Sequence, residues 1–133
     1  SKQTVLHTGG SMPLVHLYYH PHRDGWELAQ NLAAALPKII APHLTIPTRD
    51  RHDGQVTPED IIVRPSAGSS IDANTLDIEI VILAHDFPER RANLEERKEN
   101  IIKGIRAFLG EISHPLTTGS VWILLMPTAF GRI

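Results

Sequence analysis

The sequence predicts an α+β fold in which two β-α-β units form a four-stranded mixed sheet with two helices on one face. The order strand, helix, strand occurs twice in 133 residues, and equivalent elements lie roughly sixty residues apart, as in a duplicated unit. Each predicted helix is long enough to connect two parallel strands by a right-handed crossover. The last two predicted strands are apolar on both faces over much of their length, so the sheet needs a further covering layer.

The first strand is expected over residues 14–19, an apolar run that starts directly after Met12-Pro13. A helix follows, for which Asp24 is the expected N-cap and Glu27 closes a capping box. Apolar residues then recur at helical spacing: Trp26, Leu28, Ala29, Leu32, Ala33 and Leu36. Pro37 is expected to kink or end this helix, because it lacks an amide proton and crowds the preceding turn.

A long loop is expected from Ala41 to Pro58, where prolines, aspartates and a glycine recur. A short strand over residues 60–64 follows, and Pro65 is expected to end it. Residues 66–74 are rich in turn-forming side chains and predict a loop. This part of the chain completes the first β-α-β unit.

The second unit begins with the clearest strand, residues 76–83, in which isoleucine alternates with other side chains. A helix is expected from Glu89 to Leu109, with Gly110 as its C-terminal stop. Residues 121–126 form the last predicted strand, and Pro127 ends it.

Apolar side chains on both faces of the last two strands, including Val81, Leu83, Ile123 and Leu125, exceed what two helices can cover. A chain of this length has no third layer to offer. Another copy of the same chain is therefore the expected cover.

Composition excludes several classes of function. The net charge of −2 gives no electrostatic reason to expect nucleic acid or an anionic membrane as a partner. The sequence has no cysteine, so disulfides, thiolate catalysis and cysteine-bound zinc are excluded. No apolar run approaches the roughly 20 residues that span a bilayer. Nothing resembles a secretory signal, and the compartment stays open.

Residues 1–11 are small, polar and aperiodic, so we interpret them as a leader or extension before a single domain over residues 12–133, with halves at about 12–70 and 71–133. Pro13 has two interpretations. In a chain that begins at Pro13, its nitrogen is a secondary amine and a potential base. In the chain as given, it is a tertiary amide, and Pro13 simply opens a strand.

Three histidines, His16, His20 and His22, share one face if the first strand stays extended, and three histidines can bind zinc. Pro21 breaks that geometry and no carboxylate lies at a metal-binding spacing, so we expect no metal site.

A hydrolase triad could be sought in His85-Asp86 together with Ser66, Ser69 or Ser70. No nucleophile-elbow motif supports it, and the serine-rich stretch is typical of a loop.

The chain from Met12 onward resembles the tautomerase superfamily, in which an N-terminal proline opens a β-α-β unit that recurs once. It is most similar to the members of doubled length that include the cis-3-chloroacrylic acid dehalogenases. The matched stretches are residues 12–15 at the start, 121–123 in the last strand, and the aromatic-Gly-Arg at 130–132. This resemblance implies a homotrimer with six helices outside three sheets. It also implies cofactor-independent chemistry, with the proline as an acid or base in an apolar pocket between subunits.

The resemblance places Pro13 at the catalytic position. It implies that Arg23, Arg90 and Arg132 bind a substrate carboxylate, with Arg91 as the alternative to Arg90 because the register is open there. His43 approximates a histidine that the dehalogenases place after the first helix.

Two departures count against a dehalogenase. Leu124 stands where the dehalogenases have a tyrosine, and Ala129 stands where they have the glutamate that activates water. Hydration-type lyase chemistry is therefore not expected. Two hypotheses remain: an isomerase acting on a small carboxylated enol or keto acid, and a non-catalytic trimeric binding module whose Pro13 is blocked by the preceding residues.

Overall fold

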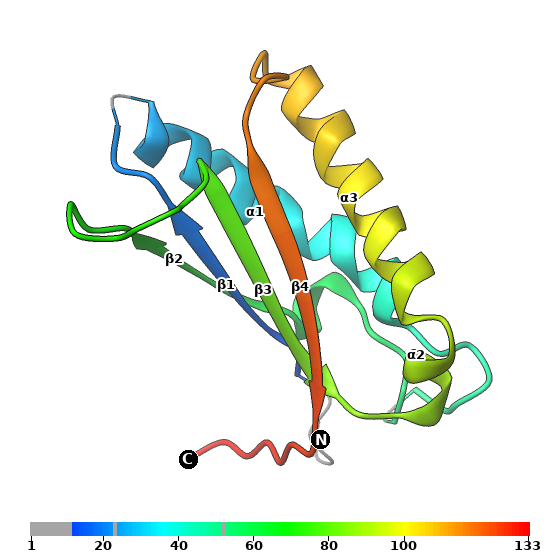
Figure 1. Ribbon diagram of the computed structural model, residues 1–133. Helices are drawn as coiled ribbons and strands as arrows, with labels where there is room; N and C mark the ends of the chain where they lie inside the picture. Colours follow the sequence, from blue (N-terminus) through cyan, green and yellow to red (C-terminus); the bar gives the residue numbers. More distant parts are fainter. Residues whose placement is uncertain (1–11, 23, 52) are drawn as a thin grey trace.

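The computed structural model describes residues 12–22, 24–51 and 53–133, and within them four strands form one mixed sheet (Figure 1). The strands are β1 (Leu14–Tyr19), β2 (Ile62–Ala67), β3 (Ile78–His85) and β4 (Gly119–Met126), in the order β2-β1-β3-β4. Pairing is parallel between β1 and β2 and between β3 and β4, and antiparallel between β1 and β3. The predicted pair of β-α-β units in a mixed sheet is confirmed.

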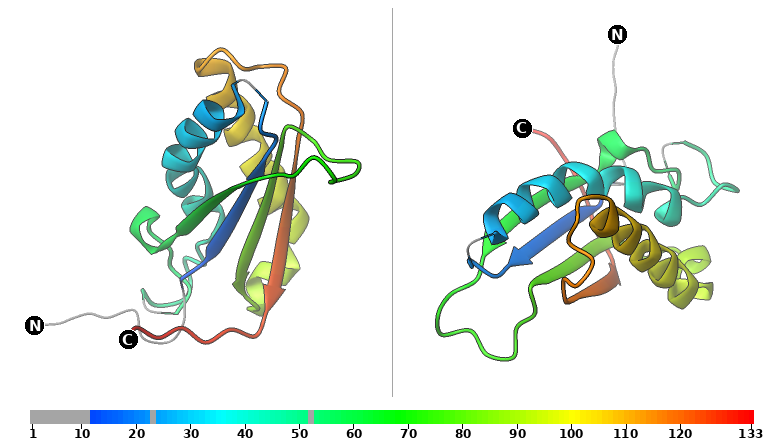
Figure 2. Two further views of the ribbon diagram at one scale, coloured as in Figure 1. Left: turned by 90° about the vertical axis from the view of Figure 1, so that its left-hand side faces the viewer. Right: turned by 90° about the horizontal axis from the view of Figure 1, so that it is seen from above.

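Two long helices, α1 (Gly25–Leu44) and α3 (Leu94–Glu111), pack side by side on one face of the sheet (Figure 2). A five-residue helix, α2 (Pro88–Ala92), precedes α3, and a 3₁₀ turn, η2 (Pro58–Asp60), precedes β2. The core lies between helices and sheet, where Leu17, Ile80 and Ile82 are fully enclosed. No helix in these described stretches is both long and apolar enough to cross a membrane.

The first helix is longer than predicted, since α1 continues through Pro37 and Pro42 to Leu44. A proline inside a helix removes one hydrogen bond and costs about 3 kcal/mol. Burial of Leu36, Ile40 and Leu44 beyond the first proline offsets that cost, because each fully buried leucine or isoleucine contributes about 1.5–3 kcal/mol. Tertiary packing therefore outweighs the local proline signal.

The predicted capping box at the start of α1 is wrong. Asp24 occupies the N-cap position, but its backbone has ψ 0° rather than the extended value, and its side chain makes no capping hydrogen bond. The capping box of the first half lies at η2 instead, where the Asp60 carboxylate accepts a hydrogen bond from the Thr57 amide at 2.8 Å.

Pro65 lies inside β2 instead of ending it. Because β2 is an edge strand, one missing amide proton costs it little. In the second unit, the predicted helix is divided at Asn93 into α2 and α3, and Gly110 lies within α3 instead of stopping it. The chain reverses at Ser113, which has a positive φ of 65°.

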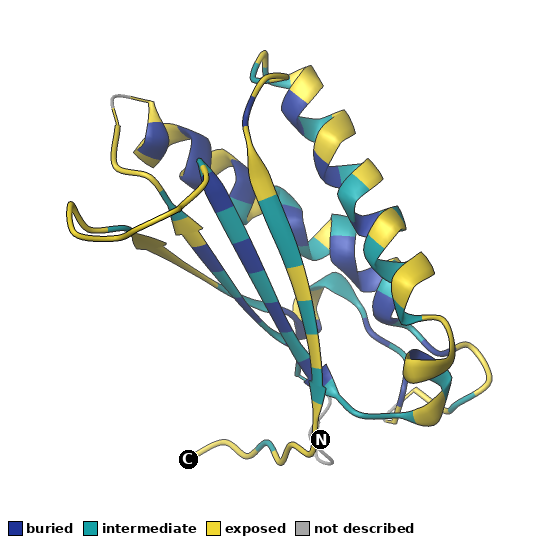
Figure 3. Cartoon of the chain, viewed as in Figure 1, coloured by how far each residue is buried: buried dark blue, intermediate teal, exposed yellow. Residues whose placement is uncertain are grey.

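No helix of the described residues lies on the second face of the sheet, and exposed residues alternate along β4 (Figure 3). Trp122, Leu124 and Met126 point to this open face and are 59%, 42% and 41% exposed. The expectation for β4 therefore needs a correction, because Ile123 and Leu125 face the helices and pack against the core. We call five apolar side chains of β3 and β4 on the open face the apolar patch: Val81, Leu83, Trp122, Leu124 and Met126.

Gly25, the first residue of α1, allows a close approach of the backbone. A Cβ atom at this position would lie 2.0 Å from the carbonyl oxygen of His20. We expect Gly25→Ala to destabilise the fold by at least about 2 kcal/mol, since backbone must move to relieve the overlap. Urea unfolding followed by circular dichroism measures this.

Gly110→Ala is the matched control, because a Cβ atom there meets nothing within 4 Å. Gly110 lies in the last turn of α3, where alanine should stabilise by up to about 0.5–1 kcal/mol. Equal unfolding midpoints for the Gly25 and Gly110 variants would contradict the steric argument.

Candidate active site

Pro13 lies directly before β1 and is buried. Its carbonyl oxygen accepts a hydrogen bond from the Ile62 amide at 3.0 Å, which joins it to the start of β2. Leu14 pairs with Leu83 of the antiparallel β3, so Pro13 lies at the end of the sheet where β3 and β4 finish. We call this the proline end of the sheet.

Arg90 of α2 reaches the proline end from the helix side, and it is only 1% exposed. Its Nε donates to the carbonyl oxygen of Leu44 at 3.0 Å, and its Nη1 donates to that of His85, also at 3.0 Å. The side chain thus joins the last residue of α1 to the last residue of β3. Its remaining nitrogen, Nη2, is buried without a hydrogen-bond partner among the described residues.

Arg90 therefore occupies a different setting from the one expected for a substrate-binding arginine. In this conformation, the enclosed guanidinium holds main-chain carbonyls and is not open to a ligand. An arginine near the start of a helix is ordinarily expected at the surface. Here Arg90 is buried and connects α1 to β3. Its place is beneath the proline end of the sheet, where it supports the main chain.

Phe87 joins Arg90 to a second cation. The Cζ atom of Arg49 lies 4.2 Å from the Phe87 ring centroid, and that of Arg90 lies 5.1 Å from it. Arg49 also forms a two-pronged ion pair with Glu89, with distances of 2.8 and 3.1 Å. Hydrogen bonding to Arg49 is the main reason that the pKa of Glu89 lies below its ordinary value.

A third cation, Arg97 of α3, donates from Nη1 to the carbonyl oxygens of His43 and Thr45 at 3.0 and 3.1 Å. Arg90 and Arg97 thus occupy the C-terminal end of α1, where unpaired carbonyls favour positive charge. Burial, followed by the positive charges of Arg97 and Arg49, lowers the pKa of Arg90 to about 10. Arg90 nevertheless stays protonated at neutral pH, so a buried positive charge lies at this end of the sheet.

We expect Arg90→Met to destabilise the fold by about 2 kcal/mol. The Leu44 carbonyl oxygen loses its donor, at about 1–3 kcal/mol for a buried group, while the His85 carbonyl oxygen keeps the Phe87 amide. Removal of a desolvated charge returns part of that cost. Arg90→Lys is the matched control: it keeps the charge but has no fork to reach both carbonyls, so its stability should be intermediate. Guanidinium unfolding measures both. A methionine variant as stable as the parent would contradict the bridging role.

The other predicted site residues divide between this end of the sheet and elsewhere. Arg91 is exposed at the same end and pairs with Asp86 at 2.7 Å. Arg132 lies in the exposed C-terminal segment, residues 127–133, with its Cζ 5.8 Å from the ring of Phe130. This segment leaves β4 and runs past the end of the sheet where β1 begins (Figure 1). His43 is half-buried in the last turn of α1, and Arg23 lies outside the described residues.

The two departures from the dehalogenase pattern fall in different places. Leu124 points to the open face as part of the apolar patch, and Ala129 is exposed in the C-terminal segment beside Thr128. Neither position offers a group that could activate water.

The described residues assemble neither the zinc site of three histidines nor the hydrolase triad. His20 and His22 stack on each other at 5.3 Å, while His16 stacks on Tyr18, and no metal-binding group of three side chains forms within the described stretches. His85 lies at the proline end, whereas Ser66 pairs with Tyr18 at the opposite end of the sheet, so no triad forms.

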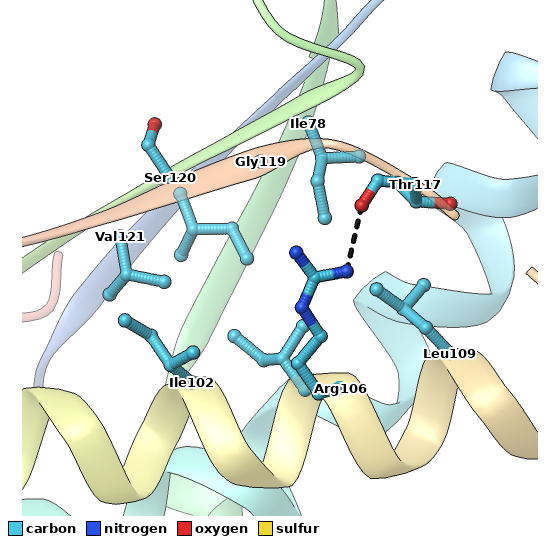
Figure 4. A pocket seen from close by; sticks show the side chains of 10 residues that line it. Ile78, Ile102, Arg106, Leu109, Thr117, Gly119, Ser120 and Val121 are labelled. Carbon is cyan, nitrogen blue, oxygen red and sulfur yellow. Dashed lines mark hydrogen bonds between the residues drawn. The ribbon is translucent and has the colours of Figure 1, made fainter. Parts of the chain in front are cut away.

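The cavities formed by the described residues include two that lie away from the proline end. One, of about 60 Å³, lies between α3 and the first residues of β3 and β4, and its lining is mostly aliphatic (Figure 4). Arg106 crosses it and donates to the carbonyl oxygen of Thr117 at 2.9 Å. The other, of about 260 Å³, lies beside Tyr18 and Glu79 at the far end of the open face. Neither is lined by Pro13 or by the arginines that the resemblance implies.

Solved structures with the same arrangement identify the fold. Native fused 4-OT is 16% identical, with a TM-score of 0.54 over 90% of this chain and 91% of that one. Malonate semialdehyde decarboxylase is 14% identical, with a TM-score of 0.51 over 90% and 91%. Both belong to the tautomerase superfamily. The chain has the tautomerase fold.

The same fold occurs in a protein of unknown function from Vibrio cholerae O1 biovar eltor, with 8% identity and a TM-score of 0.55 over 88% of this chain and 80% of that one. No protein-family model and no curated protein matches the sequence. At these identities the tautomerase fold is shared while the side chains have largely changed, and the fold by itself assigns no activity.

Arg49 and Arg97 were not predicted from the sequence. They lie with Arg90 at this end of the tautomerase fold. Arg49 lies in a loop and Arg97 on a charged helix, where such residues are ordinarily solvated. Their partners are 40 to 54 residues away along the chain. No local pattern could have indicated these contacts.

Proposed function

We propose that this protein is a tautomerase-like isomerase that acts on a small carboxylated enol or keto acid, with Pro13 as general base in a form whose chain begins at Pro13. The observation that carries the proposal is the place of Pro13 in the fold. It is buried directly before β1, at the same end of the sheet as Arg90, Arg91 and the segment with Arg132.

The chemistry needs a neutral secondary amine and a nearby positive potential. The Pro13 nitrogen takes the proton from the enol hydroxyl, and the resulting ammonium returns a proton to the adjacent carbon, which gives the keto acid. Burial disfavours the ammonium form, and the Arg90 charge does so as well, so the amine is free to act as a base near pH 7. The same positive potential stabilises the enolate that forms between the two proton transfers.

The substrate carboxylate is assigned to exposed cations. Arg132 has no carboxylate partner in its described contacts and lies in the segment that passes the proline end, so it is the first candidate. Arg23 and His43 remain candidates from the resemblance. Arg90 supports the main chain from below, and Arg91 is held by Asp86.

A homotrimer is part of the proposal. The apolar patch leaves Trp122, Leu124 and Met126 about half exposed on one face of the sheet. Contiguous apolar surface of this kind marks an interface in a folded protein. A closed ring of three copies would cover the patch of each chain with the next and place part of one copy beside the proline end of its neighbour.

A binding module on the same scaffold is the second candidate. In the full chain the Pro13 nitrogen is part of a peptide bond and cannot accept a proton, which is the observation that favours it. The malonate semialdehyde decarboxylase structure is described in terms of decarboxylase and hydratase activities. Hydratase chemistry, which adds water, is disfavoured for this chain by Leu124 and Ala129.

The experiment compares the full chain with a chain that begins at Pro13, each verified by intact mass. The decay of enol absorbance is followed with phenylenolpyruvate as the probe. We expect ketonisation above the buffer rate only with the chain that begins at Pro13. Equal rates for the two forms would overturn Pro13 as the base, and no rate in either form would favour the binding module.

A further inference from the structure

The only ring nitrogen of His85 with described hydrogen bonds faces a single residue of the C-terminal segment. Its Nδ1 lies 2.9 Å from the Thr128 hydroxyl oxygen and 3.3 Å from the Thr128 amide nitrogen. Thr128 is the second residue after β4, so these contacts occur at the first place where the chain is no longer held by strand pairing. They join the end of β3 to the start of the segment with Phe130 and Arg132.

The backbone amide determines the protonation state of the ring. A main-chain N–H can only donate, so Nδ1 must offer its lone pair, and the ring proton of neutral histidine then lies on Nε2. In that tautomer the Thr128 hydroxyl also donates to Nδ1. Protonation would place a hydrogen on Nδ1 that faces the Thr128 N–H, and the hydrogen bond from that amide would break. The Thr128 hydroxyl could rotate and accept a hydrogen bond from Nδ1 instead.

The ring is held from other sides as well. It packs edge-on against Phe87, with 4.7 Å between ring centroids. The carbonyl oxygen of His85 accepts hydrogen bonds from the Phe87 amide at 3.1 Å and from Arg90 at 3.0 Å. The Asp86 amide donates to the Met126 carbonyl oxygen at 3.1 Å, which fixes the neighbouring part of β4. His85 is thus a fixed point against which the segment can be placed.

We propose that His85 is a positioning residue that holds the C-terminal segment across the proline end through its neutral Nε2–H tautomer, and that protonation of the ring loosens the segment. The contact with Thr128 places residues 129–133, which include Arg132. The proposal rests on the two described hydrogen bonds and stands whether or not the chain is an isomerase.

The charges around the ring come from several elements. Asp86, on the turn after β3, is paired with Arg91 of α2, so that pair is close to neutral. Arg90, from the helix side, touches the His85 carbonyl oxygen and opposes a positive ring. From the C-terminal segment, the only described cation is Arg132, with its guanidinium beside Phe130. A proton on Nδ1 is incompatible with the hydrogen bond from the Thr128 amide, so the segment should be held at high pH and released at low pH.

The direct test is long-range ¹⁵N–¹H NMR of the His85 ring in the full chain, with amide hydrogen exchange of residues 128–133 at pH 5 and pH 8. We expect the Nε2–H tautomer at pH 8. After correction for intrinsic rates, we expect the Thr128 amide to exchange about five- to tenfold more slowly at pH 8 than at pH 5.

Three variants make the test specific. His85→Asn retains an acceptor near the Nδ1 position without a titrating group, so the protection at Thr128 should persist at both pH values. His85→Leu should remove the protection at both. Thr128→Val retains the amide bond but not the hydroxyl, so protection at pH 8 should fall only in part and the pH dependence should become steeper.

The proposal is overturned by the Nδ1–H tautomer at pH 8, by equal exchange in the parent and His85→Leu, or by the same pH dependence in His85→Asn as in the parent. If His85→Leu does not fold, the asparagine and Thr128→Val variants still decide the result. In an active chain beginning at Pro13, Thr128→Val should raise KM more than it lowers kcat. The NMR readout requires no activity, so its failure is distinct from failure of the isomerase proposal.

Discussion

A chain that begins at Pro13 should lose at least about a hundredfold in kcat/KM for ketonisation when Pro13 is replaced by alanine. General-base catalysis by a positioned group contributes about 10²–10⁴-fold. Pro13→Ala leaves a primary amine that rotates freely, instead of a secondary amine fixed by its ring and by the hydrogen bond from Ile62. Enol absorbance decay at pH 7, with the folded state checked by circular dichroism, measures the loss.

Ile71→Ala in the same chain is the control, because Ile71 is highly exposed in a loop and should leave the rate unchanged. A Pro13→Ala variant with full activity would make Pro13 a strand opener only. A loss that appears in KM alone would assign Pro13 to binding rather than to proton transfer.

Charge introduced into the apolar patch should convert a trimer into monomers. We expect the double variant Trp122→Glu, Leu124→Glu to sediment at one third of the parent's mass at micromolar concentration. Buried unpaired charge at an interface costs several kcal/mol, and both side chains point away from the core, so the fold itself should survive. Sedimentation equilibrium measures the mass, and circular dichroism measures the fold.

Leu116→Lys is the matched control, since Leu116 is an exposed leucine in the turn before β4, outside the apolar patch. It should leave the mass unchanged. A parent chain that sediments as a monomer would remove the trimer from the proposal, and a double variant that stays trimeric would place the interface elsewhere.

The order and type of the main elements could be predicted because they depend on periodicity. The alternation in β3 directly reports which of its side chains face the helices. The boundaries were predicted less well wherever proline dominated the local signal. Pro37, expected to kink or end its helix, and Pro65, expected to end its strand, both lie inside these elements. Burial beyond Pro37 and the edge position of β2 were not visible from the neighbouring residues.

The candidate site shows the same division. The place of Pro13 follows from the strand that it precedes, and it could be read from the sequence. The enclosure of Arg90 could not, because it depends on carbonyl groups 5 and 46 residues away. The contact of His85 with Thr128 spans 43 residues and depends on how the chain leaves β4, which no local pattern encodes.

The two edges of the sheet differ in how readily they could recruit another strand. At one edge, β2 includes Pro65 beside the charged Arg64, and both discourage the addition of a strand. At the other edge, β4 presents a run of six apolar residues without proline or charge, the pattern found in segments that form fibrils. A monomer separated from its partners would therefore be prone to aggregate from the β4 side. Assembly would protect this chain from aggregation, and its shelf life should shorten on dilution below the concentration at which the copies separate.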